Sequence, residues 1–467
     1  MKRFFVLLAA LSIALPAAAK PNILIFLADD LGYNDVGMQG CKDIPTPNID
    51  ALAKSGVRFT SGYTSGCVCS PTRAGLISGR YQQRVGFDAN AEGKAQPTDR
   101  GPRALDIKQK TFAQRMKALG YATGIVGKWH IGEGEGYRPT DRGFDEFYGY
   151  FPFGIAAMNG NVPIYRGTNV VERPANHMEQ FCKEALAFLD RHQKDPFLLY
   201  LPFSAVHGPY VGPEPWLAKF DNMVPLHRRK YAADVNQMDD IIGRVMARLR
   251  ERGLEENTLI FFLSDNGGPG GATSNDPLRG TKWTLWEGGI RVPFAASWKG
   301  HIPAGRTLPQ PVIQLDIVTT ALAAAKVDVS LRETQIESDL SRSERTTLDG
   351  ANLLPLLEGK TEAAPHDALY WRFGIQYAVR QGDWKLVKPH INDQPHLFNL
   401  AQDIGEKNDL AAQEPERVKK LQALWDDWNA KNEPPRWIDN RWDGRGPDGH
   451  KAGKGKNKAG GKAKNSA

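Results

Sequence analysis

The chain has 467 residues, 24% of them charged, and a formal net charge of +7. This length is enough for a large core and a second, smaller domain. The positive charge comes from the two ends, Lys2 and Arg3 at the start and six lysines after Asp448; without these eight charges the remainder is near −1. The composition therefore gives no support to a basic nucleic-acid-binding face, and we expect no nucleic-acid partner.

Residues 1–19 have the three parts of a secretory signal peptide. Lys2 and Arg3 form the positive start, residues 4–15 the apolar stretch, and residues 17–19 a small-residue cleavage site. The apolar stretch is too short to span a bilayer, although a membrane anchor is the alternative. No other segment is apolar enough to span, so we expect no transmembrane segment in the mature chain and a secreted or periplasmic location.

Four apolar runs each lead directly into polar residues, a pattern typical of buried strands with functional groups at their carboxyl ends. These runs are residues 22–27, 122–126, 197–203 and 258–263. The stretch from Met238 to Leu249 repeats apolar residues at helical spacing, and residues 180–189 do so more weakly. Strands that alternate with helices predict an α/β fold with a mostly parallel sheet between helices, whose carboxyl edge binds ligands.

The C-terminal part predicts a different architecture. Three short strands at residues 368–371, 377–380 and 384–387 precede a helix at residues 415–428, which indicates a small antiparallel sheet covered by one helix. The expected divisions are a signal peptide (1–19), a catalytic domain (20–327), a polar linker or surface excursion (328–347), a C-terminal subdomain (348–443) and a disordered basic tail (444–467). The tail either solubilises the protein or holds acidic polysaccharide nearby.

The segment from Cys69 to Arg80 reads C-x-P-T-R followed by a Gly-Arg pair that closes a short helix. Proline is favoured in a first helical turn, and the helix amides would favour an anion at Cys69. Arg73 lies one turn further along. An isolated Cys is usually structural, so the whole motif carries the functional interpretation. The Cys67-Val68-Cys69 spacing also admits a metal or redox site, although no second Cys pair accompanies it.

Two polar pairs follow predicted strands, Asp29-Asp30 and Asp265-Asn266. Hard oxygen ligands from two strand ends suit Ca²⁺, or less well Mg²⁺. Each pair alone would be read as a loop or helix cap. Because both pairs follow buried strands, we favour a divalent metal site.

Cationic and imidazole side chains follow the other strands. Lys128 and His130 lie two residues apart, His207 follows another strand, and Lys282 lies in a polar loop. Lysines would bind a charged ester, His130 fits a general base, and His207 fits a group that protonates or binds the bridging oxygen. Each alone is more often a surface or hydrogen-bonding residue.

Together, and in this order, these motifs resemble the active site of formylglycine-dependent type I sulfatases, of the arylsulfatase A, N-acetylgalactosamine-6-sulfatase and secreted bacterial polysaccharide sulfatase types. The resemblance implies an alkaline-phosphatase-like domain, Ca²⁺, and a formylglycine (3-oxoalanine) made from Cys69 by a formylglycine-generating maturation enzyme. Its hydrated form would attack the ester to give a sulfated enzyme. The resemblance assigns the metal to Asp29, Asp30, Asp265, Asn266 and position 69. It assigns the diol and the sulfate to Arg73, Lys128, His130, His207 and Lys282.

The resemblance predicts hydrolysis of sulfate esters, with exo-acting desulfation of a sulfated carbohydrate as the favoured activity. Trp371 and Arg372, with loops at residues 132–158, 208–215 and 267–277, are candidates for substrate binding; the alternative is that they pack the two domains together. Two other functions stay open. One is a phosphonate or phosphodiester hydrolase of the same superfamily, and the other is a non-catalytic binder of sulfated glycans.

Overall fold

The computed structural model describes residues 20–91, 102–151, 162–327, 329, 347–390 and 393–437. The predicted signal peptide, the predicted basic tail and nearly all of the predicted linker lie outside these residues. Within them, no helix is both long and apolar enough to cross a membrane.

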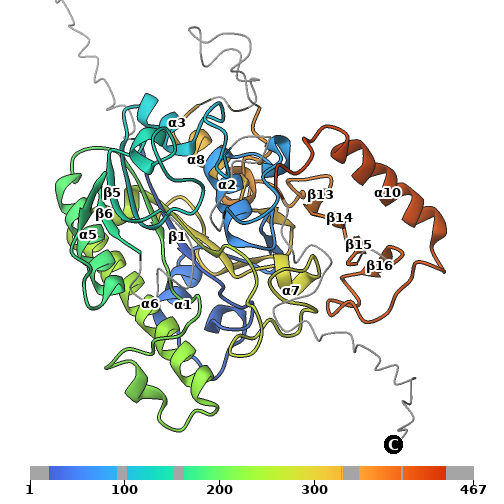
Figure 1. Ribbon diagram of the computed structural model, residues 1–467, viewed down its shortest axis with the longest axis horizontal. Coiled ribbons are helices and arrows are strands. Elements are labelled where there is room, and N and C mark those ends of the chain that lie inside the picture. The colour runs from blue at the N-terminus through green and yellow to red at the C-terminus, as the bar shows by residue number, and fades with distance from the viewer. Residues whose placement is uncertain are drawn as a thin grey trace, which may run out of the picture.

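A ten-stranded sheet forms the centre of the molecule, in the order β11-β2-β10-β9-β1-β8-β4-β5-β6-β7 (Figure 1). The strands are β1 (Asn22–Ala28), β2 (Val57–Phe59), β4 (Ala122–Lys128), β5 (Glu146–Tyr150), β6 (Ile164–Arg166), β7 (Asn169–Val171), β8 (Phe197–Pro202), β9 (Thr258–Ser264), β10 (Phe294–Ser297) and β11 (Arg306–Leu308). The four strands predicted from the sequence are β9, β1, β8 and β4, which are neighbours and parallel. Their carboxyl ends therefore meet at one edge, as predicted. A separate parallel pair joins β3 (Gly62–Tyr63) to β12 (Val312–Ile313).

Helices cover both faces of this sheet because side chains along the central strands alternate between two apolar clusters. On β1, Leu24 and Phe26 join one cluster with α1 (Pro47–Lys54), α5 (His177–Arg191) and α6 (Leu226–Glu251). Ile23, Ile25 and Leu27 join the other with α2 (Cys69–Ser78), α3 (Phe112–Ala118), α8 (Asp316–Ala324) and α9 (Leu354–Leu357). Both predicted helices are confirmed as α5 and α6. The short helices are η1 (Gly37–Gln39), η2 (Gln82–Val85), η3 (Pro139–Arg142), η4 (Leu217–Phe220), η5 (Glu255–Asn257) and α7 (Glu287–Ile290).

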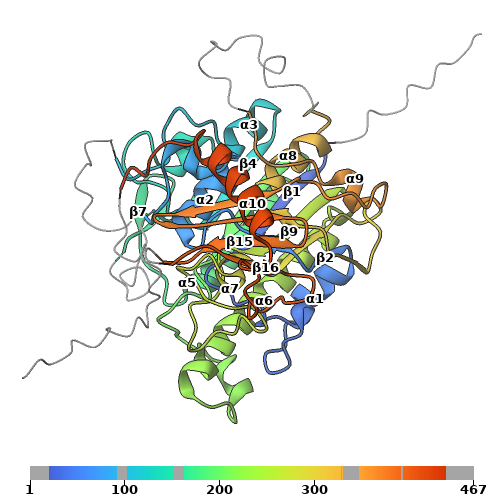
Figure 2. The same cartoon turned by 90° about the vertical axis from the view of Figure 1, so that its right-hand side faces the viewer.

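A second, antiparallel sheet follows near the C-terminus, with α10 (Pro415–Asn429) lying across it (Figure 2). Its strands are β13 (Leu369–Phe373), β14 (Gln376–Gln381), β15 (Trp384–Lys388) and β16 (His396–Asn399). One face packs Val379, Leu386 and Leu397 against Leu421 of α10. The other face packs against residues of the larger domain, including Tyr63 of β3 and Trp286, the residue before α7. The predicted antiparallel sheet and covering helix are confirmed.

A buried set of charged side chains joins this small sheet to the rest of the protein. Lys385 on β15 contacts Glu287 Oε1 and Glu406 Oε1, each at 2.9 Å. The other Glu287 oxygen, Oε2, accepts from Tyr63 Oη at 2.5 Å and from Arg291 Nη1 at 3.1 Å, and Glu406 Oε2 accepts from the Glu287 backbone amide at 2.7 Å. We call Glu287, Arg291, Lys385 and Glu406 the ionic junction.

Candidate active site

The predicted polar residues converge at the carboxyl edge of the four central strands. Asp29 and Asp30 follow β1, Lys128 ends β4, and Asp265 follows β9. Backbone bonds tie these loops together: the Asp29 amide donates to Ala205 O, and the Asp265 amide donates to Ala28 O, each at 3.0 Å. The sheet register therefore brings residues far apart in the sequence into one cluster.

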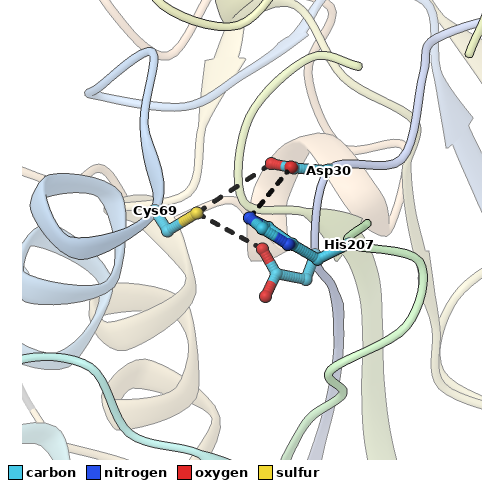
Figure 3. Close-up of side chains that lie close together, drawn as sticks. Asp30, Cys69 and His207 are labelled. Atoms are coloured by element: carbon cyan, nitrogen blue, oxygen red, sulfur yellow. Dashed lines mark hydrogen bonds and ion pairs between the residues drawn. The ribbon is translucent and has the colours of Figure 1, made fainter. Parts of the chain in front are cut away.

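Cys69 is the first residue of α2, and its thiol points into this cluster (Figure 3). Its Sγ lies 3.3 Å from Asp29 Oδ1, 3.9 Å from Asp30 Oδ1 and 3.3 Å from Lys282 Nζ. Burial, together with the carboxylates of Asp265 and Asp29, raises the pKa of the thiol well above its usual range. Because the thiolate is the nucleophilic form of cysteine, the unmodified side chain is a poor nucleophile here.

Each of three buried carboxylates has its own cationic partner. Lys128 Nζ lies 2.5 Å from Asp29 Oδ2, and Lys282 Nζ lies 2.7 Å from Asp30 Oδ1. Arg73 donates from Nε and Nη2 to the third carboxylate, at Asp265 Oδ2, at 3.0 and 2.8 Å. Burial raises the pKa of Asp29, but the charges of Lys128 and Arg73 outweigh it and hold that pKa well below its usual range. These carboxylates and cations form a site that can bind both a cation and an anion.

The oxygen-rich part of the cluster fits a hard divalent cation. Side-chain donor atoms of Asp29, Asp30, Cys69 and His207 all lie within 4.8 Å of one another. Asn266 Nδ2 donates to Asp30 Oδ1 at 2.7 Å, while its buried Oδ1 has no hydrogen-bond partner among the described residues. A buried acceptor without a donor is costly, and a bound cation would satisfy it. Asp265 is not in this group of four: Arg73 donates to its Oδ2, and its Oδ1 accepts from the Asp30 amide at 3.2 Å.

The two imidazoles differ in their surroundings. His207 Nδ1 lies 2.6 Å from the carbonyl oxygen of Gly208, so this nitrogen donates, and Nε2 faces Asp30 Oδ2 at 3.4 Å. Burial lowers the pKa of His207, and the Asp30 carboxylate partly opposes it. Burial and the Lys128 charge lower the pKa of His130 well below its usual range. Both shifts favour the neutral ring, which is the form that the general base predicted at His130 requires.

Three residues of this region have a left-handed backbone without being glycine. Asp30 has φ 64°, His130 has φ 65°, and Trp283, next to Lys282, has φ 76°. Such conformations cost roughly 1–3 kcal/mol and cluster at functional sites.

One supporting residue was not predicted from the sequence. Ser264, the last residue of β9, accepts from the Leu31 amide at 3.0 Å and donates to Asn266 O at 2.8 Å. It therefore joins the loops that carry the two predicted metal-ligand pairs. Its place directly before Asp265-Asn266 was the available signal, but a serine at a strand end is too common to single out.

The predicted sugar platform at Trp371 is contradicted by its burial. Trp371 is 0% exposed, packs against the Tyr63 ring at 5.3 Å and donates from its indole nitrogen to Thr64 O at 2.6 Å. Arg372 forms an ion pair with Asp88 at 2.8 Å and donates to Glu433 O. Both residues pack the small sheet against the catalytic part, which was the alternative reading.

The Cys67-x-Cys69 metal or redox pair also gains no support. All four cysteines carry free thiols, and Cys67 is absent from the group of candidate metal ligands found in the described part of the chain. Of the predicted substrate loops, residues 152–158 lie outside the described residues.

Comparison with known proteins decides the family. The profile described as Sulfatase matches residues 21–327. The chain belongs to the sulfatase family. N-acetylgalactosamine-6-sulfatase of Homo sapiens is 31% identical over 463 residues, covering 87% of this chain and 85% of that protein. Arylsulfatase D of Homo sapiens is 30% identical and covers 76% of this chain and 71% of its own length.

Solved structures share the architecture over most of the chain. Ps i-CgsB in complex with k-i-k-neocarrahexaose is 31% identical with a TM-score of 0.80, covering 90% of this chain and 95% of that one. PsFucS1 sulfatase from Pseudoalteromonas sp. is 27% identical with a TM-score of 0.75, covering 88% and 90%. The fold is thus the alkaline-phosphatase-like sulfatase fold, and the protein is a sulfuric ester hydrolase. Its family implies a metal ion and a formylglycine.

Proposed function

We propose that this sulfatase removes sulfate from a carbohydrate by exo-acting hydrolysis, with Cys69 as the formylglycine precursor and Ca²⁺ as the metal. The carrying observation is the environment of Cys69. Its thiol lies at the start of α2, between Asp29 and the Lys282 ammonium, each 3.3 Å away. Burial raises the pKa of this thiol, which disfavours the thiolate, so conversion to another nucleophile fits this position.

The two absent groups would complete this site. Hydrated formylglycine at position 69 would supply a hydroxyl nucleophile. Ca²⁺, held by Asp29, Asp30, Asp265, Asn266 and position 69, would neutralise charge on the sulfate and on the nucleophile. Mg²⁺ is the weaker candidate.

The remaining residues have roles that their contacts support. Lys128 and Lys282 would bind sulfate oxygens, since both ammonium groups are buried beside the nucleophile position. Arg73 would brace position 69 from the next turn of α2 while holding Asp265. His130, neutral and buried, would accept the proton from the nucleophile position, and His207 would serve the bridging oxygen. In the net reaction, water cleaves the S–O bond: its oxygen goes to sulfate, one of its protons goes to the alcohol, and the other is released to solvent.

The carbohydrate substrate is supported by relatives rather than by the site alone. One relative is named for N-acetylgalactosamine 6-sulfate, and one structural neighbour was crystallised with a neocarrahexaose, a six-sugar chain. The N-terminal signal-like segment supports a secreted or periplasmic protein, where such glycans occur. A phosphonate monoester hydrolase shares the fold at 20% identity, which supports the fold alone.

The test is sulfate release from a panel of sulfated monosaccharides and hexasaccharides, with galactose, N-acetylgalactosamine, glucosamine, fucose and uronate types. Protein co-produced with a formylglycine-generating enzyme is compared with Cys69→Ala, and an aryl phosphodiester is included. Release from one sugar type, lost in Cys69→Ala, is expected. Faster turnover of the phosphodiester than of every sulfate would overturn the proposal, as would glycan binding without release by protein that carries formylglycine.

A further inference from the structure

A cavity of about 410 Å³ lies beside the catalytic cluster, between the start of α5 and the side of α6. Its lining includes His177 and Met178 of α5, Asp234 of α6, and Val211 from the segment that follows β8. This volume is within the range of sites for small molecules, roughly 300–1,000 Å³. None of these four residues has a part in the proposed reaction.

The cavity and the catalytic cluster share a wall. His207 lines the cavity, and the same ring faces Asp30 from Nε2. Ala205 also lines the cavity, while its carbonyl accepts from the Asp29 amide at 3.0 Å. Because His207 is the residue proposed to serve the bridging oxygen, the alcohol side of the ester is the side nearest to this cavity.

The lining is amphipathic, as a pyranose ring requires. Met178, Val211 and two prolines supply apolar surface. The Asp234 carboxylate accepts from the amides of Val211 and Gly212 at 3.1 and 3.0 Å, and a carboxylate has about four acceptor positions in all, so it can also accept from a hydroxyl.

Two side chains at the start of α5 add hydrogen-bonding groups. His177 uses Nε2 to contact Ser204 Oγ at 2.7 Å. The side-chain oxygen of Asn176 caps α5 by accepting from the Glu179 amide at 3.1 Å, which leaves its NH₂ group as a donor. Together with the apolar surface, these groups provide both the ring contacts and the hydroxyl contacts that sugar binding needs.

Arg173 adds a cation to this lining. Its Nη1 donates to Val162 O at 3.1 Å. A planar guanidinium suits sulfate or carboxylate groups, which recur along anionic glycans.

We infer that this cavity binds the sugar unit next to the one that loses its sulfate, and that Arg173 selects an anionic substituent on it. The inference rests on the proposed carbohydrate sulfatase function. It predicts a preference for oligosaccharides over the corresponding sulfated monosaccharide, and it places that preference in residues separate from those that perform hydrolysis.

The experiment closes the cavity without touching the reacting groups. Ala175 lines the cavity and is exposed, so Ala175→Trp would fill its mouth, and Ala175→Ser is the matched control. With a hexasaccharide that the wild type desulfates, Ala175→Trp is expected to lower kcat/KM by about tenfold, mainly through KM. With the sulfated monosaccharide, kcat/KM of Ala175→Trp should stay within about twofold of wild type, because the contacts to the sugar that loses its sulfate are unchanged. An equal fall for both substrates, or no fall for the hexasaccharide, would overturn the inference.

A second variant and a binding measurement separate this inference from the proposed function. Arg173→Gln should weaken binding of the hexasaccharide by about five- to tenfold. Arg252→Gln should leave that binding unchanged, because Arg252 is an exposed arginine paired with Asp190. Calorimetry of k-i-k-neocarrahexaose and of glycosaminoglycan hexasaccharides uses Cys69→Ala protein with and without Ala175→Trp. If the wild type releases no sulfate, the proposed function fails. Weaker hexasaccharide binding with Ala175→Trp would then still support a sugar-binding role for the cavity. Unchanged or absent binding would overturn that role.

Discussion

Two buried clusters in this protein pair carboxylates with cationic side chains but have different roles. The catalytic cluster sets Asp29, Asp30 and Asp265 against cationic side chains, and the ionic junction sets Glu287 and Glu406 against Lys385 and Arg291. In the junction, both oxygens of each glutamate contact donors of the protein itself. In the catalytic cluster, a buried acceptor, Asn266 Oδ1, has no hydrogen-bond partner among the described residues.

In the junction, the buried charges are contacted by groups of the protein itself, whereas in the catalytic cluster a bound ion and substrate would supply the remaining contacts. A buried ion pair contributes to stability only when its hydrogen bonds are all made, and removal of one partner leaves a costly charge. In the junction, Lys385 lies 2.9 Å from both glutamates and joins the small sheet to α7, although Glu406 Oε1 makes no hydrogen bond among the described residues. The catalytic cluster keeps polar groups directed at an ion and a substrate, as an active site must. Paired substitutions in the two clusters should therefore affect turnover in one case and folding in the other.

The largest effect on turnover is expected from Lys282→Met. Loss of this ammonium, 3.3 Å from Cys69 Sγ, should lower kcat/KM for the sulfated substrate by about 10²–10³, the usual range for a group that stabilises developing charge. With Ca²⁺ present, the free energy of unfolding should change by less than about 1 kcal/mol, because the ion can compensate Asp30. Steady-state kinetics and urea unfolding check both numbers. A stability loss as large as the catalytic loss would contradict the contrast.

The matched change in the junction is Lys385→Met. It leaves Glu287 and Glu406 buried without their shared cation, which should cost about 3–5 kcal/mol in the free energy of unfolding. The folded fraction should keep kcat/KM within about twofold of wild type, since Lys385 contacts no proposed catalytic residue. Urea unfolding followed by kinetics at low temperature tests this. A wild-type stability would show that the junction does not hold the sheets together.

Asn266→Ala tests the metal site. If Asn266 Oδ1 is a ligand, its loss should raise the Ca²⁺ concentration for half-maximal activity by about 10–100-fold, as loss of supporting groups does at other metal sites. Activity after chelation and stepwise return of Ca²⁺ or Mg²⁺ measures this. Asn236→Ala is the control, because Asn236 is another buried asparagine that donates to Pro45 O. An unchanged Ca²⁺ requirement in Asn266→Ala would remove this residue from the site.

The smallest effect concerns pH and Glu406. Burial and the neighbouring Glu287 carboxylate raise the pKa of Glu406 to about 7, so between about pH 4.5 and 7 the folded protein holds a proton that the unfolded chain has released. The stability from this group therefore falls as pH rises through that window. The difference in the free energy of unfolding between Glu406→Gln and wild type should therefore shift by about 2 kcal/mol in favour of the variant when the pH rises from about 5 to about 8.

Glu287→Gln gives the opposite control for that measurement. Although burial raises the pKa of Glu287, Lys385 and Arg291 lower it to about 2. This carboxylate therefore stabilises the fold above about pH 4.5, and its loss should destabilise the protein at both pH values. Urea unfolding at the two pH values compares the variants. A difference between Glu406→Gln and wild type that does not vary with pH would contradict the assigned shift.

The sequence was sufficient for features that depend on local pattern. Apolar runs indicate buried strands, so β1, β4, β8 and β9 could be predicted. Parallel pairing of these strands brings the residues that follow them to one edge of the sheet, which are Asp29, Lys128, His207 and Asp265. Features made by packing between distant segments could not be predicted. Trp371 looked like a ligand platform because nothing local shows that Tyr63 covers it. The ionic junction likewise joins Glu287, Lys385 and Glu406, which share no motif.

The most direct test of the central claim measures what residue 69 is in active protein. Mass spectrometry of the tryptic peptide that ends at Arg73 would give the fraction of Cys69 converted to formylglycine, in preparations made with increasing amounts of maturation enzyme. We predict that sulfate release per molecule rises in proportion to that fraction and extrapolates to zero for unconverted protein. Full activity in protein whose residue 69 remains a thiol would contradict the account.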